Sequence, residues 1–483
     1  MERTVKCRKL IKDLPILVKG SKEVNITGIE EDSRRIVPGN LFIARRGKTV
    51  DGAKMIPHAI ANGAVAVLTD MYDPFLPVVQ LISQDIVSQI PLLAARFYQN
   101  PSEEIEVIGI TGTNGKTMTG YLLQHLFTKL GKPCGLMGTI ERWIGDVRVP
   151  ASLTTADVLT NQKYLRDMCN HGLKKAVMEV SSHALAQSRV EGITFDTAVF
   201  TNLSQDHLDF HGTMDRYFAA KKKLFTEHAR RNAIINRDDP SYVLLQEGLA
   251  LCTYTYGIKH PADVMAEDVE LSLEKSAFTV SFSGQKTRFT LPLIGAFNVY
   301  NALAAVATGL LYGENLADMA AAWQDFPGVA GRMQRVQGHV FVDYAHTPDG
   351  LEKAIQTLKQ IAKDPVIVVF GCGGNRDLEK RPIMAQVAER YADFSIVTSD
   401  NPRKEDPKEI AEQIIQGFTK TEHYAVELDR KAAIEKAINL AKTLPQPAVV
   451  LIAGKGHEET QEFAHTTTFF NDVEVAREAL YHA

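Results

Sequence analysis

Cysteine is scarce in this sequence, and the spacing of the cysteines indicates neither a disulfide framework nor a metal site. The five cysteines are Cys7, Cys134, Cys169, Cys252 and Cys372, and no two of them form a CxxC pair. An odd number of widely separated thiols is typical of proteins in a reducing compartment. We therefore expect a cytoplasmic protein.

The sequence also lacks long apolar runs and a strong imbalance of charge. No apolar stretch approaches the length of about 18 residues that a membrane-spanning helix needs. The first residues contain no unbroken apolar segment, so we expect no signal peptide. The formal net charge is −4 at pH 7, which gives no indication of a nucleic-acid or membrane partner.

The chain is too long for a single hydrophobic core. With 483 residues and a typical size of about 150 residues per domain, it predicts about three domains. A turn-rich break, "NPSEE", follows Gln99, and a glycine-rich segment covers 326–338. These breaks place the expected domains at 1–103, 104–332 and 333–483.

Alternation of buried strands with helical patterns predicts an α/β fold with a largely parallel sheet. Residues 105–110 form an apolar strand pattern, and 117–130 carry apolar residues at helical spacing before Gly131. Between Thr253 and Pro292, apolar and polar residues alternate with a period of two, which predicts an excursion from the parallel sheet into antiparallel strands. Further strand patterns occur within 174–182, 195–204, 232–239, 339–346, 365–374, 393–400 and 447–458.

The segment "GTNGKT" joins the first of these strands to its helix. Glycines let backbone N–H groups turn towards an anion, and the helix N-terminus adds a favourable dipole. A lysine in this loop reaches the β- and γ-phosphates of a nucleotide, and the following hydroxyl binds magnesium. We therefore predict an ATP site formed by Gly112, Thr113, Asn114, Gly115, Lys116 and Thr117.

Several acidic and histidine residues follow later strands. Glu179 ends one strand and is a candidate magnesium ligand. The segment "NLSQDHLDFHG" then gathers Asp206, His207, Asp209 and His211 within six residues. Helix caps would account for single carboxylates, and the spacing is unlike that of common zinc sites. The lysine run 221–223 has a simpler interpretation as a solvated helix face.

The ordered motifs resemble the Mur ligase family, whose members are ATP-dependent amino-acid-adding enzymes of peptidoglycan synthesis. The resemblance implies three domains: an N-terminal UDP-binding α/β domain, a central P-loop-type ATPase with a parallel sheet, and a C-terminal Rossmann-like domain that brings the amino acid. It covers nearly the whole chain through "GTNGKT", "EVSSHALAQSR", "NLSQDHLDFHG", "YFAAKKKLF", "INRDD", "GAFNVYNALAA", "PGVAGRMQ" and "VDYAHTPDGLEKAI".

The resemblance also implies a mechanism. ATP phosphorylates a substrate carboxylate, and an incoming amine attacks the acyl phosphate and expels phosphate. Lys116 and Thr117 would hold phosphate and Mg²⁺, Glu179 would hold one Mg²⁺ ion, and His207 would hold a second. Arg332 would meet the γ-phosphate. Asp343 and Asn298 would contact the ribose and the adenine side, with Asn301 as a weaker candidate; Asp343 and His346 have a plain alternative as strand-end caps.

Lys221 matches a family lysine that carries a carbamate (N6-carboxylysine). The carbamate turns an ammonium into a metal ligand, and forming it requires a neutral amine. We expect the neighbouring charges of Lys222 and Lys223 to favour the neutral form.

Within the family, the segments 31–47 and 48–56 resemble the enzymes that add the third peptide residue. Their substrate is UDP-N-acetylmuramoyl-L-alanyl-D-glutamate. Ala156 stands where the family usually has proline, from which we expect a softer turn. The implied contacts to this substrate are Ser33, Thr154, Thr155, Ser181, Gln187 and Arg189.

The "DNPR" segment resembles the signature of members that add meso-diaminopimelate rather than L-lysine. Holding the second carboxylate of diaminopimelate favours a planar bidentate donor such as Arg403. By itself the segment is also compatible with a simple turn before a helix, with Arg403 in solvent. Asn375 stands where the family more often has aspartate. The implied amino-acid contacts are Arg376, Asp400, Asn401, Pro402, Arg403, Gly454 and Glu458.

Three other functions stay open at this point. L-Lysine addition would leave Arg403 without a ligand, and a folylpolyglutamate-synthase-like ligase would lack the UDP-binding domain. A nucleotide-dependent switch would hydrolyse ATP without any amino acid. The expected partners are ATP, the UDP-linked dipeptide and meso-diaminopimelate, with Mg²⁺ as cofactor; the family inclines to monomers.

Overall fold

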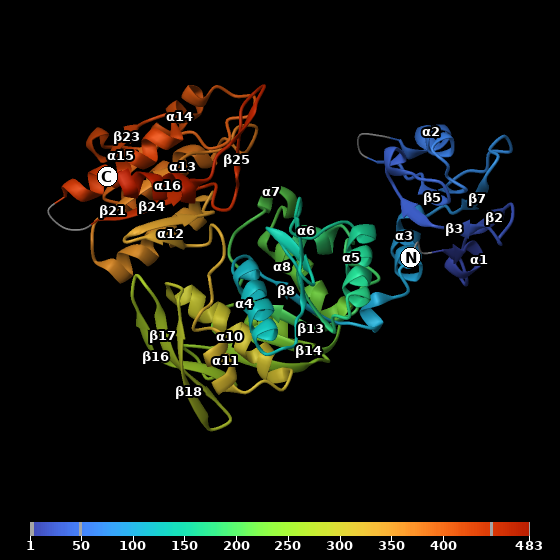
Figure 1. The fold of residues 1–483 in the computed structure, drawn as a ribbon, viewed down its shortest axis with the longest axis horizontal. Helices are drawn as coiled ribbons and strands as arrows, with labels where there is room; N and C mark the ends of the chain where they lie inside the picture. The colour runs from blue at the N-terminus through green and yellow to red at the C-terminus, as the bar shows by residue number, and fades with distance from the viewer. Residues whose placement is uncertain (1–3, 48–50, 445–447, 483) are drawn as a thin grey trace. The chain divides into compact units, whose positions relative to one another are not determined.

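The computed structural model, drawn as a ribbon in Figure 1, describes residues 4–47, 51–444 and 448–482. The chain divides into two compact units, Met1–Tyr256 and Gly257–Ala483. Residues 48–50 of the segment 48–56, and Pro447 at the start of the strand pattern 447–458, lie outside the described residues. Among the described residues, no helix is both long and apolar enough to cross a membrane.

The first unit begins with a small α/β layer. Its sheet has the order β2-β7-β6-β5-β4, in which β4 to β7 are parallel and β2 is antiparallel to β7. Its elements are β1 (Val5–Lys6), α1 (Cys7–Leu10), β2 (Leu17–Lys19), β3 (Asn25–Ile26), β4 (Gly28–Glu30), β5 (Asn40–Ile43), α2 (Ile56–Ala61), β6 (Ala66–Thr69), β7 (Val79–Ile82) and α3 (Ile86–Phe97).

A second, mainly parallel sheet follows in the same unit, in the order β11-β10-β9-β12-β8-β13-β14-β15. Only β10 and β11, at one edge, run antiparallel to their neighbours. The strands are β8 (Glu106–Thr111), β9 (Gly135–Met137), β10 (Glu141–Ile144), β11 (Val147–Pro150), β12 (Lys175–Glu179), β13 (Phe195–Phe200), β14 (Ala229–Asn236) and β15 (Cys252–Gly257).

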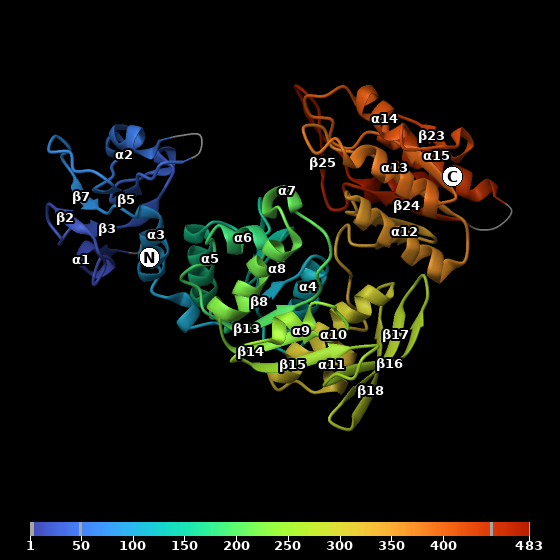
Figure 2. The same cartoon turned by 180° about the vertical axis from the view of Figure 1, so that it is seen from behind.

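The strand β8 lies between β12 and β13, at the point where the connections change direction. In open α/β sheets, ligands bind beyond the carboxyl ends of the strands at such a point. The helices of this part are α4 (Lys116–Lys129), α5 (Val158–Asn170), α6 (Ser182–Ala186), α7 (Leu208–His211), α8 (Met214–Lys223) and α9 (Tyr242–Gln246). Figure 2 shows this group from behind, with α8 and α9 in view.

The second unit starts with three antiparallel strands covered by two helices. They are β16 (Val264–Leu271), β17 (Ser276–Phe282), β18 (Gln285–Leu291), α10 (Ala296–Leu311) and α11 (Leu316–Ala322). The predicted antiparallel excursion is therefore confirmed for these strands. It was wrong for β15, which pairs in parallel with β14, because period-2 alternation reports one buried face and not the direction of the partner strand.

A six-stranded sheet completes the second unit, with the order β19-β20-β24-β21-β22-β23, all parallel except β19. The strands are β19 (Gln334–Gln337), β20 (Val340–Asp343), β21 (Val366–Phe370), β22 (Phe394–Val397), β23 (Tyr424–Val426) and β24 (Val449–Ala453). Around them lie α12 (Pro348–Ala362), α13 (Lys380–Tyr391), α14 (Pro407–Ile415), α15 (Arg430–Thr443), α16 (Asp472–His482) and the hairpin β25 (Thr460–Glu462) and β26 (Thr467–Phe469).

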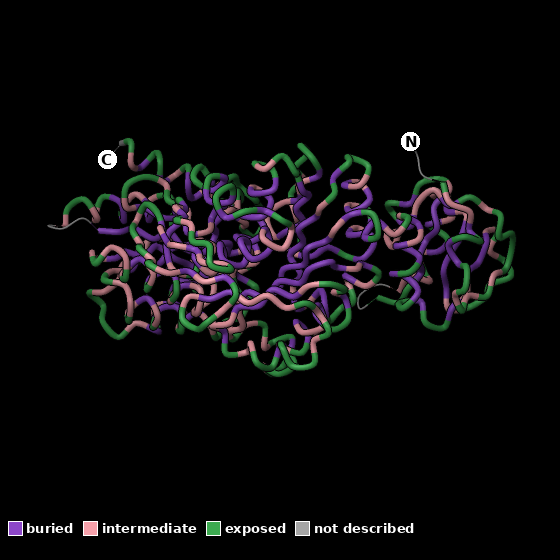
Figure 3. Tube along the Cα trace, turned by 90° about the horizontal axis from the view of Figure 1, so that it is seen from below, coloured by how far each residue is buried: buried purple, intermediate pink, exposed green. Residues whose placement is uncertain are grey.

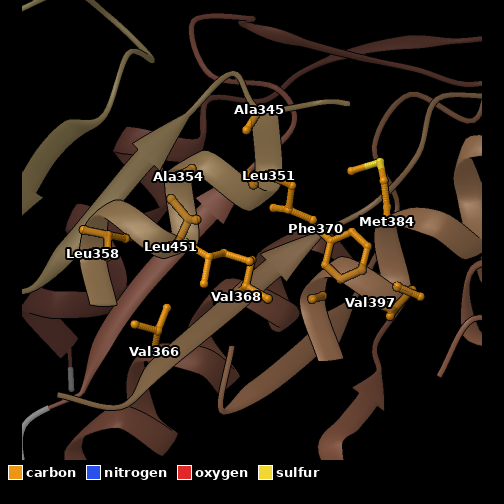
Figure 4. Close-up of a cluster of buried hydrophobic side chains, with 14 of the residues drawn as sticks. Ala345, Leu351, Ala354, Leu358, Val366, Val368, Phe370, Met384, Val397 and Leu451 are labelled. Atoms are coloured by element: carbon orange, nitrogen blue, oxygen red, sulfur yellow. The ribbon is translucent and has the colours of Figure 1, made fainter. Parts of the chain in front are cut away.

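Both faces of this sheet are covered, because alternate residues of each strand point to opposite sides. Val366, Val368 and Phe370 pack against α12, α13 and α14 (Figure 4). Ile367 and Val369 pack against α15 and α16. Figure 3 shows the resulting pattern, with buried segments inside and exposed residues on the outer loops. Burial on both faces explains why the strands read as continuous apolar runs.

One ion pair is completely buried in the second unit. Arg430 and Asp472 have no exposed side-chain surface, and two N–O distances of 2.7 Å join them. Arg430 also donates to the carbonyl oxygens of Ser399 (3.3 Å) and Ala453 (3.0 Å). The Arg430 guanidinium thus links the first residues of the loop after β22 to the end of β24.

We expect Arg430→Met to lower the stability of this unit by about 3–5 kcal/mol, because it leaves the Asp472 carboxylate buried and unpaired. Thermal and denaturant unfolding of the full chain would measure the change, with the exposed Arg390→Met as the matched control. Equal unfolding midpoints for the two variants would contradict the expectation.

Candidate active site

The loop between β8 and α4 has the geometry of a phosphate cradle. Gly112 and Gly115 have φ angles of 147° and 88°, which favour glycine. The loop is fixed from the β13 side: Asn114 N donates to Asn202 Oδ1 (3.0 Å), and Thr201 Oγ1 donates to the Asn114 carbonyl (2.6 Å). The predicted strand and helix at 105–110 and 117–130 are confirmed to within one residue at each end.

The glycine at 112 is also required by space. A Cβ atom there would lie 1.9 Å from Thr201 Oγ1 and 3.0 Å from Asn202 N. We expect Gly112→Ala to displace the loop and to lower kcat/KM for ATP by about 100-fold. Gly172→Ala is the matched control, because Gly172 has a φ of 77° but no atom within 4 Å of the added carbon. Equal kinetics for both variants would contradict a steric requirement at 112.

Two lysines meet at the carbonyl oxygen of Gly112. Lys116 Nζ donates to it (2.9 Å) and to the Thr113 carbonyl (2.9 Å), and Lys221 Nζ donates to it from α8 (2.8 Å). Lys221 is only 2% exposed, and its ammonium lies over the ring of Tyr217. Burial and the nearby Lys116 hold the pKa of Lys221 well below its usual value of 10.5.

The simple interpretation of 221–223 as one solvated face was therefore wrong for Lys221. The expected influence of its two neighbours was also wrong. Lys222 Nζ donates to the carbonyls of Leu244 and Glu247, and Lys223 pairs with Glu227. On a helix, adjacent residues point in different directions. The positive charge that lowers the pKa of Lys221 therefore comes from Lys116, which is distant in the sequence.

Glu179 lies at the end of β12 and is fully buried. Its Oε2 atom accepts hydrogen bonds from Thr117 Oγ1 (2.9 Å) and Thr139 Oγ1 (2.9 Å), and Oε1 accepts one from Thr139 N (2.9 Å). Thr139 Oγ1 also lies 3.1 Å from Thr154 Oγ1; since the single Thr139 hydroxyl proton goes to the carboxylate, the Thr154 hydroxyl is the donor. A continuous hydrogen-bonded chain therefore joins the phosphate loop to one of the predicted dipeptide residues.

The histidines lie in a group beside this loop. His207 has a left-handed backbone (φ 53°), and its Nε2 lies 3.4 Å from Asp206 Oδ2. The His183 ring is within 4.6 Å of the His207 ring and 5.5 Å of the His211 ring, centre to centre. Burial lowers the pKa of His207, against the opposing effect of Asp206. A neutral imidazole is the form that ligates metal.

Three of the six residues predicted to hold the UDP-linked dipeptide line one cleft of about 1180 Å³ in the first unit. Ser33, Gln187 and Arg189 line it. Ser33 Oγ lies 3.0 Å from His58 Nδ1, and Arg189 donates to the Thr155 carbonyl (3.1 Å) and to Gln187 Oε1 (2.6 Å). The arginine thus joins two of the predicted contacts.

Thr155 and Ser181 are hydrogen-bonded to each other next to Arg189 of the cleft. Thr155 Oγ1 donates to the Glu179 carbonyl (2.8 Å) and accepts from Ser181 N (3.0 Å). Ala156 is buried, and its carbonyl accepts from Asn161 (3.0 Å). A proline would offer the same carbonyl, so this hydrogen bond does not depend on the departure from the family pattern.

In the second unit, Arg332 and Asp343 lie beside Tyr344. The Arg332 guanidinium carbon is 4.8 Å from the Tyr344 ring centre, and its Nε is buried without a hydrogen-bond partner among the described residues. Asp343 Oδ2 accepts from Met333 N (2.6 Å). Burial raises the pKa of Asp343, which Arg332 opposes.

The adenine-side candidates are both buried. Asn298 donates to the Ile294 carbonyl (2.9 Å) and accepts from Asn301 (3.1 Å). His346, the other residue with a plain alternative as a cap, has its Nδ1 2.8 Å from the Tyr344 carbonyl oxygen.

The "DNPR" loop follows β22, next to the loops after β21 and β24. Arg403 adopts a left-handed backbone (φ 54°), and its N–H donates to the Glu462 carbonyl (2.9 Å). Its Nη1 donates to the Gly374 carbonyl (3.0 Å), and its Nε lies 2.9 Å from Glu462 Oε2. Pro402 is buried. The alternative of a plain turn with Arg403 in solvent was therefore wrong, because the side chain is held on two sides.

The other predicted amino-acid contacts surround this loop. Asn401 Nδ2 donates to Glu458 Oε2 (2.8 Å). Gly454 has a φ of 115°, and a Cβ atom there would lie 2.6 Å from Asp400 Oδ2. Arg376 is exposed and lies beside Gly373, where a Cβ would be 3.7 Å from its Cγ. Three neighbouring strand ends therefore bring these residues together.

Asn375, the second departure from the family pattern, has a left-handed backbone with a φ of 53°. Its side-chain oxygen accepts from Lys404 N (3.2 Å), and its own N–H donates to Glu405. Asparagine tolerates this backbone conformation well, which gives the departure a local structural reason.

Family models match most of the chain. The Mur ligase family catalytic domain matches residues 25–96, the Mur ligase middle domain 110–309, and the Mur ligase glutamate ligase domain 331–456. The chain belongs to the Mur ligase family. As a Mur ligase it is an ATP-dependent enzyme that forms amide bonds.

Relatives are similar over the full length. A UDP-N-acetylmuramoyl-L-alanyl-D-glutamate–2,6-diaminopimelate ligase of Chlamydia trachomatis is 43% identical over 480 residues, which cover 98% of each chain. The ligase of the same name from Geobacillus kaustophilus is 44% identical over 470 residues, which cover 94% of this chain and 95% of the relative. A solved structure with that ligase name is 33% identical, with a TM-score of 0.72 and 99% coverage of both chains.

The fold alone is shared more widely. A folylpolyglutamate synthase of Mycobacterium tuberculosis superposes with a TM-score of 0.62 at 18% identity, and the match covers 81% of this chain and 94% of that one. This likeness covers less of the present Mur ligase than the diaminopimelate ligase structure does.

Several residues of this Mur ligase site had not been predicted. Thr139, His183, Lys455 and Glu462 all contact predicted residues. His183 lies inside the quoted motif "EVSSHALAQSR", and Lys455 lies inside the strand pattern 447–458, so the position after a strand end was an available signal. No sequence signal pointed to Thr139 or Glu462, because the residues that they contact are distant in the sequence.

Proposed function

We propose that this chain adds meso-diaminopimelate to the D-glutamate of UDP-N-acetylmuramoyl-L-alanyl-D-glutamate, with ATP, in peptidoglycan precursor synthesis. The observation that carries the proposal is the oriented Arg403 beside Asn401 and Glu458, in a chain that resembles diaminopimelate ligases over its full length. The far end of diaminopimelate carries an amine and a carboxylate. Glu458 can accept from the amine, and the planar Arg403 guanidinium can donate to the carboxylate.

The proposed domains are 1–103 for the UDP end, 104–332 for ATP and 333–483 for the amino acid. The γ-phosphoryl group passes from ATP to the D-glutamate carboxylate, giving ADP and an acyl phosphate. The α-amine of diaminopimelate then attacks the acyl carbon, loses a proton and expels inorganic phosphate. Lys116 and Arg332 supply positive charge for the transferring phosphoryl group.

Mg²⁺ fits the residues beside the phosphate loop. Thr117 and Glu179 place a hydroxyl and a carboxylate oxygen 2.9 Å apart, and hard oxygen donors are what Mg²⁺ prefers. When bound, the ion neutralises negative charge on the phosphates. The chain's own contribution is to hold those oxygens through Thr139 and to offer a neutral imidazole at His207.

A carbamate at Lys221 fits its surroundings as well. Carbamate formation needs a neutral amine, and the lowered pKa of this buried lysine provides one. The modified side chain would add a carboxylate where the Lys221 Nζ now meets the Gly112 carbonyl. It would thus be a further oxygen ligand beside the phosphate loop.

The partners we propose are small molecules only: ATP, the UDP-linked dipeptide and meso-diaminopimelate. We also propose a cytoplasmic location, which the nucleotide substrates support, and we expect a monomer without a nucleic-acid or membrane partner.

The experiment that tests the function is phosphate release from ATP and Mg²⁺ with the UDP-linked dipeptide, in separate reactions with meso-diaminopimelate, L-lysine or neither. We expect release with diaminopimelate only. Equal release with L-lysine would overturn the role of the "DNPR" loop, and release without any amino acid would overturn the ligase mechanism.

A further inference from the structure

Lys455 is a buried lysine in the second unit that the mechanism above does not use. Its side chain has no exposed surface. Its Nζ donates to Asn401 Oδ1 (3.1 Å), to Glu458 Oε2 (3.2 Å) and to the Thr460 carbonyl (2.6 Å). Burial of an ammonium is costly unless its hydrogen bonds are satisfied, and here all three of its N–H groups have an acceptor.

The three acceptors come from two segments, since Glu458 and Thr460 are only two residues apart. Asn401 lies in the loop after β22, Glu458 in the loop after β24, and Thr460 at the start of β25. Asn401 and Glu458 are also joined directly, since Asn401 Nδ2 donates to Glu458 Oε2 (2.8 Å). The Lys455 ammonium therefore closes a triangle with the amide and the carboxylate.

This triangle leaves one oxygen of Glu458 for a ligand. Both donors, Asn401 Nδ2 and Lys455 Nζ, reach Oε2. No donor from the described part of the chain reaches Oε1, and the Glu458 side chain is 31% exposed. An oxygen held in this way is suited to accept from a substrate ammonium.

The same ammonium also fixes the loop that carries Arg403. Asn401 Oδ1 accepts from Lys455 and from Glu462 N (3.0 Å), and Arg403 lies two residues further on, paired with Glu462. Lys455 thus connects the acceptor for an amine with the donor for a carboxylate.

We propose that Lys455 is a positioning residue for the far end of the amino-acid substrate. It orients Glu458 towards the ammonium group and, through Asn401, holds the loop that presents Arg403 to the carboxylate. The proposal rests on the proposed function. It assigns specificity to a residue that has no exposed surface of its own with which to touch the substrate.

The fold does not depend on Lys455 to hold these loops at their roots. Arg430, paired with Asp472, already donates to the carbonyls of Ser399 and Ala453, which precede the two loops. We therefore expect Lys455→Met to fold and to disturb only the outer part of the loops.

The test is steady-state kinetics of the full chain with Lys455→Met. We expect KM for meso-diaminopimelate to rise about 10-fold or more, since charged hydrogen bonds are lost. KM for ATP and for the UDP-linked dipeptide should stay within about twofold, as for an independent site. The matched control is Lys404→Met, which removes the same charge from an exposed position next to Arg403, in the neighbouring loop after β22.

A second arm places Lys455→Met in a Glu458→Gln background. Because the lysine acts partly through this carboxylate, its removal should raise KM for diaminopimelate less there than in the wild-type background. A residue with a purely structural role would give the same factor in both backgrounds.

The outcomes are distinguishable. If the wild-type chain releases no phosphate with diaminopimelate, the proposed function fails. If it does and Lys455→Met behaves like Lys404→Met, or all three KM values rise together, the inference about Lys455 is overturned. Should Lys455→Met not fold, Lys455→Arg keeps the charge with a different geometry and is expected to show the same selective rise in KM. Failure of both variants to fold would assign Lys455 to the fold alone and also overturn the inference.

Discussion

Replacing Lys221 by alanine is expected to lower ligase activity by about 1,000-fold. The side chain is buried at the carbonyl of Gly112, next to Lys116, and its lowered pKa makes it the amine in this loop that can accept a carbamate. The variant removes both the amine and the carboxylate that the carbamate would supply. Phosphate release with all three substrates measures the loss, and added short carboxylic acids should restore part of it.

Lys222→Ala is the matched control, because the Lys222 ammonium donates to Leu244 and Glu247 away from the phosphate loop. Its activity should stay close to that of the wild type. With ¹³C-labelled bicarbonate, a carbamate signal should appear in the wild type and in Lys222→Ala and be absent from Lys221→Ala. If no carboxylic acid restores activity and no labelled signal is seen, the carbamate role is wrong.

Replacing Arg403 by lysine is expected to raise KM for meso-diaminopimelate by roughly 30-fold, which corresponds to about 2 kcal/mol. The Arg403 guanidinium donates to the Gly374 carbonyl and pairs with Glu462 while part of it stays exposed. A single ammonium cannot keep these two contacts and also bind a carboxylate in bidentate fashion. KM for ATP should change little, because the phosphate loop is untouched.

The control for this substitution is Arg390→Lys, the same exchange at an exposed arginine on α13 that lies over Tyr391. An Arg403→Lys enzyme with an unchanged KM for diaminopimelate would overturn the specificity role of the loop. A parallel rise in KM for ATP and for the UDP-linked dipeptide would point to a general loss of structural order instead.

Local structure was largely readable from the sequence. The strand pattern predicted within 393–400 contains β22 (Phe394–Val397), and the strand and helix around "GTNGKT" agree to within one residue at each end. Burial on both faces of a parallel sheet makes such strands continuous apolar runs. The direction of β15 was not readable, because alternation carries no information about the partner strand.

The chemistry of the candidate site was readable only in part. Sequence motifs identified the phosphate loop and the "DNPR" loop, since residues close in sequence at a strand end stay close in space. They did not identify the distant residues that contact the side chains of these loops. Lys221 reaches the Gly112 carbonyl, which it shares with Lys116, across 109 positions, and Glu462 reaches Arg403 across 59 positions.

The sequence alone thus determined the family, the order of the elements and the residue types available for phosphate, carboxylate and amine recognition. Only the tertiary structure decided which lysine is buried, which cation lies beside it, and which carboxylate and amide fix Glu458 through Lys455. Burial and electrostatic coupling depend on distances between segments that are remote in the chain. Periodicity and motif spacing describe neighbours along the chain and therefore cannot supply those distances.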